Sequence, residues 1–228
     1  MKRYLPFIIV AAVALSAVGV GAAIYRTKKQ RLAAATTVNV HDPAGAKPGA
    51  KPAHVRGSAK GTITIEEFAD FQCPPCGGIS GIVKELEKKN TDRLRVVFRH
   101  YPLRNHANAV PAALAAEAAG LQGKFWEMHD ELFKNQLAWS KAPEPRSLFT
   151  DYATSLGLDT KRFAADMNDE KLKARVTADQ ERATSMGVSR TPSIFINGQS
   201  IPAESFSVTG LQTAIDSAAQ GNKQAAAK

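Results

Sequence analysis

The residues best suited to chemistry are two cysteines, Cys73 and Cys76, in a C-x-x-C spacing. They are the only cysteines among the 228 residues. A thiol pair at this spacing can alternate between dithiol and disulfide, or can supply half of a metal site. A four-cysteine zinc site cannot form without further cysteines, so we expect no bound metal. Relay of copper through the two thiols remains an alternative.

The two cysteines lie where a predicted strand meets a predicted helix. Apolar residues on both faces of 62–71 indicate a strand inside a sheet that is covered on both sides. The helix is predicted to begin with Cys73 as N-cap and Pro74 as first residue, since a proline there loses no hydrogen bond. It continues to about Asn90, and a second strand follows over 94–98. Strand, helix and strand of this length predict a parallel β-α-β unit.

This position predicts different roles for the two thiols. A helix N-terminus lowers the pKa of a thiol from about 8.5 by one to several units, so we expect Cys73 to be the exposed nucleophile. Cys76, one turn further, is expected to be buried and to act as the resolving thiol. Pro74 and Pro75 remove two backbone N–H donors, and no histidine lies between the cysteines. We therefore predict that the pKa of Cys73 is lowered only moderately.

Glu67 is the third candidate for this site. It shares a strand face with Ile63, Ile65 and Ala69, and it precedes Cys73 by six positions. Burying a lone acid is costly, which favours a functional interpretation in which Glu67 relays a proton to Cys76. The alternative is a glutamate at the strand edge that pairs with a lysine.

The second half of the chain is predicted to return to the sheet after a helical region. Helical spacing of apolar residues predicts several helices over 107–168 and a long one over 169–186. A short strand over 193–196, a hairpin turn at Asn197-Gly198 and a last helix complete the domain. The tail, 220–228, is predicted to be disordered.

Thr191 and Pro192 stand immediately before the short strand. A Thr-Pro pair at this place is compatible with a cis peptide bond. A proline there also leaves a neighbouring backbone edge free to pair with an extended substrate segment. An ordinary trans proline in a loop is the alternative.

The net charge of +9 is carried by residues 1–60, which precede this predicted domain. Residues 1–60 hold ten Lys or Arg and one acid, Asp42, so that residues 61–228 carry equal numbers of bases and acids. The domain therefore has no global basic surface of the kind that binds nucleic acid, and we expect no nucleic-acid partner.

The first part of the chain predicts a membrane segment. Tyr4–Tyr25 contains no charged residue and is long enough to cross a bilayer. We interpret 1–32 as a signal anchor with basic flanks, the alternative being a signal peptide cleaved after the small residues near Gly21. Four basic residues follow the span, which by the positive-inside rule alone would place the domain in the cytoplasm.

Residues 33–60 are predicted to be a flexible linker. They are rich in Ala, Pro, Gly, Lys and Thr and have few large apolar residues to bury. His41 and His54 are expected to be solvated side chains without partners for a metal site.

Four sequence blocks in the same order resemble the DsbA-like thioredoxin-fold family of thiol–disulfide oxidoreductases. The resemblance covers about residues 55–218. The blocks are Phe68-x-Asp-Phe-x-Cys-Pro-x-Cys76, Val97-Phe-Arg-His-Tyr-Pro-Leu103 with His106, Gly123-Lys-Phe-Trp-Glu-Met-His129, and Gly187-Val-x-x-Thr-Pro-x-Ile-Phe-Ile-Asn-Gly198.

The resemblance implies an α/β thioredoxin domain over 61–219 with a helical insertion at about 104–186. It implies that Thr191 and Pro192 form a cis-proline loop facing Cys73, and that Glu67 is the family's buried acid. Pro74, Pro75, Thr191 and Pro192 are then the expected substrate-binding residues. No cofactor is expected beyond the redox-active disulfide.

The resemblance also implies a cellular location and binding partners. The family usually acts outside the cytoplasm, so we expect a membrane-anchored domain in the periplasm or at the cell surface, or a secreted one if the signal is cleaved. The expected partners are protein substrates and a membrane protein of the DsbB or vitamin-K-epoxide-reductase type that restores the disulfide.

One departure from the family pattern affects the expected activity. The dipeptide between the cysteines is Pro-Pro, not the Pro-His of the best-studied oxidases, which favours a weaker oxidant. We expect an oxidase of secreted proteins. A reductase or isomerase that uses the same cysteines remains an alternative, although no dimerisation domain is visible. A non-catalytic thioredoxin-fold binding or copper-handling module is the alternative from another class.

Overall fold

The computed structural model describes residues 42–226 of the chain. The predicted anchor or signal segment, 1–32, lies outside the described residues. Among the helices of 42–226, none is both long enough and apolar enough to cross a membrane.

A mixed five-stranded sheet forms the centre of the domain, in the order β1-β3-β2-β4-β5. The strands β2 (Ile63–Ala69) and β3 (Leu94–His100) are parallel and are joined by helix α2 (Pro74–Lys89), which confirms the predicted β-α-β unit. Strand β4 (Ser193–Ile196) pairs antiparallel with β2, and β5 (Gln199–Ile201) completes the predicted hairpin.

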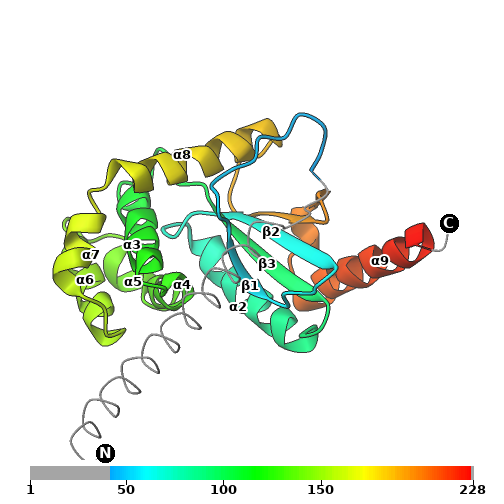
Figure 1. The fold of residues 1–228 in the computed structure, drawn as a ribbon, viewed down its shortest axis with the longest axis horizontal. Coiled ribbons are helices and arrows are strands. Elements are labelled where there is room, and N and C mark those ends of the chain that lie inside the picture. Colours follow the sequence, from blue (N-terminus) through cyan, green and yellow to red (C-terminus); the bar gives the residue numbers. More distant parts are fainter. Residues whose placement is uncertain (1–41, 227–228) are drawn as a thin grey trace, which may run out of the picture. The chain divides into compact units, whose positions relative to one another are not determined.

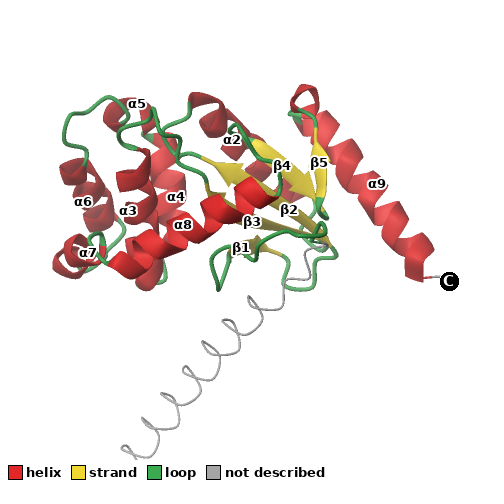
Figure 2. Ribbon diagram, turned by 90° about the horizontal axis from the view of Figure 1, so that it is seen from above, coloured by secondary structure: helices red, strands yellow, loops and turns green. Residues whose placement is uncertain are grey.

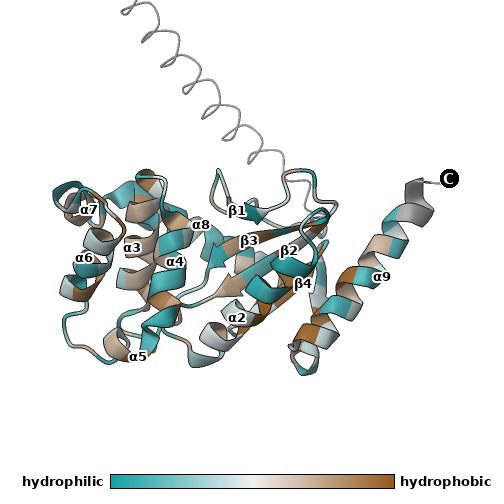
Figure 3. Ribbon diagram, turned by 90° about the horizontal axis from the view of Figure 1, so that it is seen from below, coloured by the Kyte–Doolittle hydropathy of each residue, from teal (hydrophilic) through white to brown (hydrophobic). Residues whose placement is uncertain are grey.

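Helices cover both faces of this sheet (Figure 1). On one face α2 and α9 (Val208–Ala226) pack against isoleucines and valines of the strands. Helix α8 (Glu170–Ser185) lies across the other face, where Ala183 contacts Phe68 and Phe195 (Figure 2). Hydrophobic and hydrophilic residues alternate along α9, as expected for a helix with one buried side (Figure 3).

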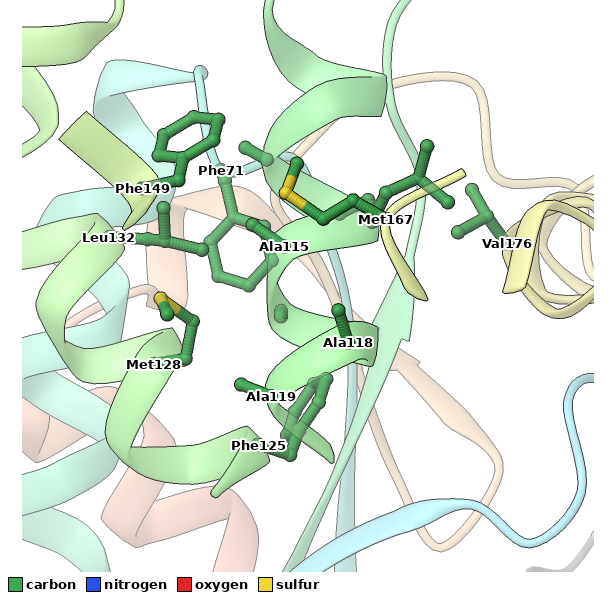
Figure 4. Packing of buried hydrophobic residues seen from close by; sticks show 14 of the residues in the cluster. Phe71, Ala115, Ala118, Ala119, Phe125, Met128, Leu132, Phe149, Met167 and Val176 are labelled. Atoms are coloured by element: carbon green, nitrogen blue, oxygen red, sulfur yellow. The ribbon is translucent and has the colours of Figure 1, made fainter. Parts of the chain in front are cut away.

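The helical region lies between β3 and β4, as predicted. Its helices are α3 (Ala109–Leu121), α4 (Phe125–Lys134), α5 (Gln136–Trp139), α6 (Arg146–Ser155), α7 (Thr160–Asp166) and α8. Phe71, Met128, Leu132 and Phe149 pack in its core (Figure 4). Cys73 and Cys76 belong to the same buried cluster. The helical region therefore forms one wall of the redox motif.

Strand β1 (His54–Gly57) corrects the prediction of a flexible linker over 33–60. It pairs antiparallel with β3, with Val55 opposite Val97. The indole N–H of Trp126 donates to the carbonyl of Val55 at 3.1 Å, and Arg56 forms ion pairs with residues of α2 and α4. The segment is ordered by partners far away in the sequence, which its own composition does not reveal. The described part of α9 likewise extends into the predicted disordered tail, 220–228.

Two neighbouring glutamates on β2 face opposite sides of the sheet. The carboxylate of Glu66 is buried between Arg99 and Arg182, with an N–O distance of 2.7 Å to each. The guanidinium of Arg99 also donates to the carbonyl of Ala50, which ties the segment before β1 to the domain. Glu67 points to the other face, towards α2, and forms no ion pair within residues 42–226.

Candidate redox site at the start of helix α2

The redox motif has the predicted position at the N-terminus of α2. Cys73 is the N-cap, with φ −74° and ψ 118°, and Pro74 is the first helical residue. The backbone N–H of Cys76 donates to the carbonyl of Cys73 at 3.1 Å. Both thiols are free, so that this is the dithiol form.

The accessibility of Cys73 differs from the prediction. Cys73 is only 5% exposed, and Cys76 is completely buried. The order of exposure is as expected, but Cys73 is not an exposed side chain, because the Thr191 loop lies against its sulfur. The sulfur of Cys73 is 3.5 Å from the carbonyl oxygen of Thr191.

The surroundings of Cys73 favour its thiolate. A hydrogen bond from the thiol of Cys76 lowers the pKa of Cys73 to about 6, against the effect of burial, and the side chain of Thr191 contributes in the same direction. This lowering agrees with the moderate decrease in pKa that the Pro-Pro dipeptide predicts. Burial raises the pKa of Cys76, so that this thiol keeps its proton.

The carboxylate of Asp70 was not predicted as part of this site. It accepts hydrogen bonds from the backbone N–H groups of Gln72 (2.7 Å) and Leu103 (2.9 Å). The ring nitrogen Nδ1 of His106 lies 2.7 Å from it. Asp70 thereby fixes the turn before Cys73, while its negative charge raises the pKa of that thiol.

Glu67 is a buried acid, as the functional interpretation of its strand position requires. It is 2% exposed, and its Oε1 has no hydrogen-bond partner within residues 42–226. Burial raises the pKa of Glu67 to about 8, although the positive charge of Arg56 opposes this. A charge on Glu67 in turn raises the pKa of Cys76, so that the two groups interact electrostatically. The alternative of a lysine-paired edge glutamate does not hold among the described residues.

An apolar groove of about 400 Å³ lies beside the motif. Its walls include Pro75 and Ile82 of α2, the loop residues Thr191 and Pro192, and Phe206. The Thr191-Pro192 peptide bond is cis, as predicted. Three of the four expected substrate-binding residues therefore share one groove. Pro74 is exposed and lies outside its lining.

Gln136 of α5 holds the motif from the side of the helical region. Its amide nitrogen donates to the carbonyls of Phe71 (2.6 Å) and Cys73 (2.9 Å). A Cβ at Gly77 would lie 3.2 Å from Oε1 of Gln136, so that any side chain there would press on this amide. Sequence reasoning missed Gln136, because nothing in the short segment around it indicates a contact across 63 residues.

The histidine His54 is not the solvated linker residue that was predicted. Its Nε2 and that of His100 approach the same oxygen of Glu117, at 2.9 and 3.1 Å. The three side chains are close enough to hold a metal ion. However, the guanidinium of Arg175 already pairs with Glu117 at 2.7 Å. Arg175 and the two rings account for the buried carboxylate without an ion.

A family model described as Thioredoxin matches residues 50–217. The chain is similar to a thioredoxin-like oxidoreductase from Silicibacter pomeroyi, with 27% identity, a TM-score of 0.63 and coverage of 74% of this chain and 92% of that one. It is also similar to BdbD from Bacillus subtilis, with 23% identity, a TM-score of 0.68 and coverage of 78% and 98%.

Among curated proteins the similar sequences carry another name. The Na(+)/H(+) antiporter NhaA 1 of Mycolicibacterium gilvum is 40% identical over 151 residues, which are 64% of this chain and 23% of that protein. NhaA 3 of Salinispora tropica is 43% identical over 147 residues. The chain spans about a quarter of the length of these relatives.

Proposed function

The chain belongs to the DsbA-like thioredoxin family, and on this basis we propose that it is an extracytoplasmic thiol–disulfide oxidoreductase that introduces disulfides into secreted proteins. The observation that carries the proposal is the position of Cys73. It caps α2, receives a hydrogen bond from Cys76 and lies against Thr191 beside an apolar groove. We propose no transport activity, although the curated relatives are named for one, because the chain spans only about a quarter of their length.

The oxidised protein holds a Cys73–Cys76 disulfide. A thiolate of the substrate attacks Sγ of Cys73, the bond between the two cysteines breaks, and a mixed disulfide with Cys73 forms. Sγ of Cys76 leaves as a thiolate. Because burial raises the pKa of both Cys76 and Glu67, the protonated carboxyl of Glu67 is suited to give its proton to this thiolate.

A second thiolate of the same substrate then attacks the substrate sulfur that is bonded to Cys73 in the mixed disulfide. The substrate leaves with a new disulfide, and Cys73 leaves as a thiolate. A low pKa makes Cys73 a good leaving group, which favours release of oxidised substrate. The substrate has lost two electrons and the protein disulfide has gained them. Glu67 recovers its proton from solvent.

The direction of this reaction depends on the reduction potential of the Cys73–Cys76 pair. With a potential below that of the compartment, the same residues would reduce substrate disulfides. The lowered pKa of Cys73 stabilises the reduced protein as its Cys73 thiolate and therefore favours the oxidase. We propose reoxidation by a membrane protein of the DsbB or vitamin-K-epoxide-reductase type.

A glutathione redox titration of the full chain tests the proposal. We expect one two-electron transition between the disulfide and dithiol forms, with a potential above that of thioredoxin, about −270 mV. A lower potential would favour the reductase. The variant Cys73→Ser should lose disulfide exchange completely. If a cellular activity of the chain survives in that variant, the protein is a binding or copper-handling module instead.

A further inference from the structure

Arg190 differs from the rest of the groove beside the redox motif. It is the one charged residue among those that line this groove. Its side chain is exposed, and its guanidinium makes no hydrogen bond or ion pair within residues 42–226. Glu204, which follows the groove residue Ala203 in the sequence, forms no ion pair with Arg190 among the described residues.

Most arginines of the domain are already paired. Six of them form ion pairs with carboxylates at N–O distances of 3.3 Å or less, and these are Arg56, Arg93, Arg99, Arg162, Arg175 and Arg182. Arg104 and Arg146 share the unpaired state of Arg190 within the described residues, but neither lines this groove. Arg190 is therefore the arginine that can offer its charge to a molecule in the groove.

Arg190 is next in the sequence to a residue that contacts the reacting sulfur of Cys73. Arg190 directly precedes Thr191, whose carbonyl oxygen lies 3.5 Å from the sulfur of Cys73. Residues of an extended segment are about 3.3 Å apart along the chain. A substrate that bonds to Cys73 and runs through the groove thus brings residues within about three positions of its cysteine into reach of the guanidinium.

We propose that Arg190 selects substrate segments that carry a carboxylate within about three residues of the reacting cysteine, with an apolar side chain in the groove. This inference rests on the proposed function. Residues 61–228 have no net charge, and the basic residues of 1–60 are the same in every variant, so a field from them would favour the acidic peptide equally in all variants. An exposed ion pair contributes about 0.2–1 kcal/mol, which predicts a preference of about 1.4- to fivefold at low salt.

The test uses the oxidised full chain and three reduced peptides. Each peptide has two cysteines and the same apolar residues, and a Glu, Gln or Lys stands two positions from the first cysteine. The second-order rate constant of disulfide exchange is measured for each peptide. For the unmodified chain we expect the order Glu, Gln, Lys, with a difference that becomes smaller at high salt.

Two charge reversals make the test specific. Arg190→Glu should invert the order, whereas Arg104→Glu, at an exposed arginine that lines a different cavity, should leave it unchanged. Equal ratios in the unmodified chain and in Arg190→Glu would overturn the assignment, as would the same change in both variants. Failure of the neutral Gln peptide to react at all would instead overturn the proposed function.

Discussion

The sulfur of Cys73 lies 3.5 Å from the carbonyl oxygen of Thr191, although 118 positions separate the two residues in the sequence. In the dithiol form the S–H of Cys73 is the donor in this contact. The hydroxyl of Thr191 is buried and has no partner among the described residues. When Cys73 loses its proton, its contact with the carbonyl ends, and the hydroxyl is the nearby donor able to stabilise the thiolate.

Thr191→Val tests this role of the hydroxyl. Valine keeps the shape of threonine but cannot donate, so the pKa of Cys73 should rise above its value of about 6 by up to about one unit. Thiolate absorbance titrated against pH measures this. At about pH 5 or below, where Cys73 keeps its proton, the free energy of unfolding should not decrease, because the hydroxyl has no partner to lose there. An unchanged pKa would show that Thr191 acts only through its backbone.

Glu67→Gln tests the buried acid through the pH dependence of stability. Burial raises the pKa of Glu67 to about 8 from 4.5, so the folded protein binds a proton that the unfolded chain releases between these values. The stabilisation is complete below about pH 4.5 and is lost as the pH rises to about 8. The free energy of unfolding should therefore fall with pH, relative to the variant, by at most about 1.4 kcal/mol per pH unit.

Urea unfolding at several pH values for the two proteins gives this difference. It should stop growing above about pH 8, where Glu67 is charged in both states. Parallel stability curves over the whole range would mean that Glu67 is charged in the folded protein, and the proton transfer to Cys76 would lose its donor.

Glu66→Gln should have a different effect, although Glu66 is the neighbour of Glu67. The change leaves the buried guanidinium groups of Arg99 and Arg182 without their shared carboxylate. Breaking a buried pair in this way costs about 3–5 kcal/mol. The free energy of unfolding should fall by this amount. The ratio of disulfide to reduced protein in a glutathione buffer should stay the same. A shift of that equilibrium would show that the ion-pair network influences the thiols.

The contrast between Glu66 and Glu67 shows what the sequence can predict. Alternation along β2 placed Glu67 on the face of its apolar neighbours and six positions before Cys73, and both follow from local geometry. The N-cap at Cys73 and the parallel pairing of β2 with β3 are predictable for the same reason. The pairing of Glu66 with Arg182 is not, because it joins residues 116 positions apart.

The wrong predictions for His54, β1 and Cys73 have the same cause, which is contact between residues far apart in the sequence. His54 and β1 looked like linker because a short segment with few apolar residues cannot order itself, yet Glu117, Trp126 and β3 order it from outside. Cys73 was expected to be exposed because the helix end alone leaves it open. Its cover comes from Thr191, on a loop whose position depends on the whole sheet.

Two glycines of α2 provide a test of the contact with Gln136. Gly81→Ala places its Cβ in open space and should stabilise the protein by about 1 kcal/mol through helix propensity. Gly77→Ala has the same propensity gain, but its Cβ would lie 3.2 Å from Oε1 of Gln136. We expect a smaller gain or a loss of stability in thermal unfolding. An equal gain in both variants would show that the amide of Gln136 moves away at no cost.

The most direct test of the account is to trap its covalent intermediate. In the Cys76→Ala variant the resolving thiol is absent, so mixed disulfides between Cys73 and substrate proteins should persist after expression in the native compartment. Mass spectrometry of the purified adducts should find Cys73 linked to cysteines of secreted proteins, and the double variant Cys73→Ser, Cys76→Ala should yield none. Equal recovery of adducts from both variants, or no protein adduct on Cys73, would contradict the account.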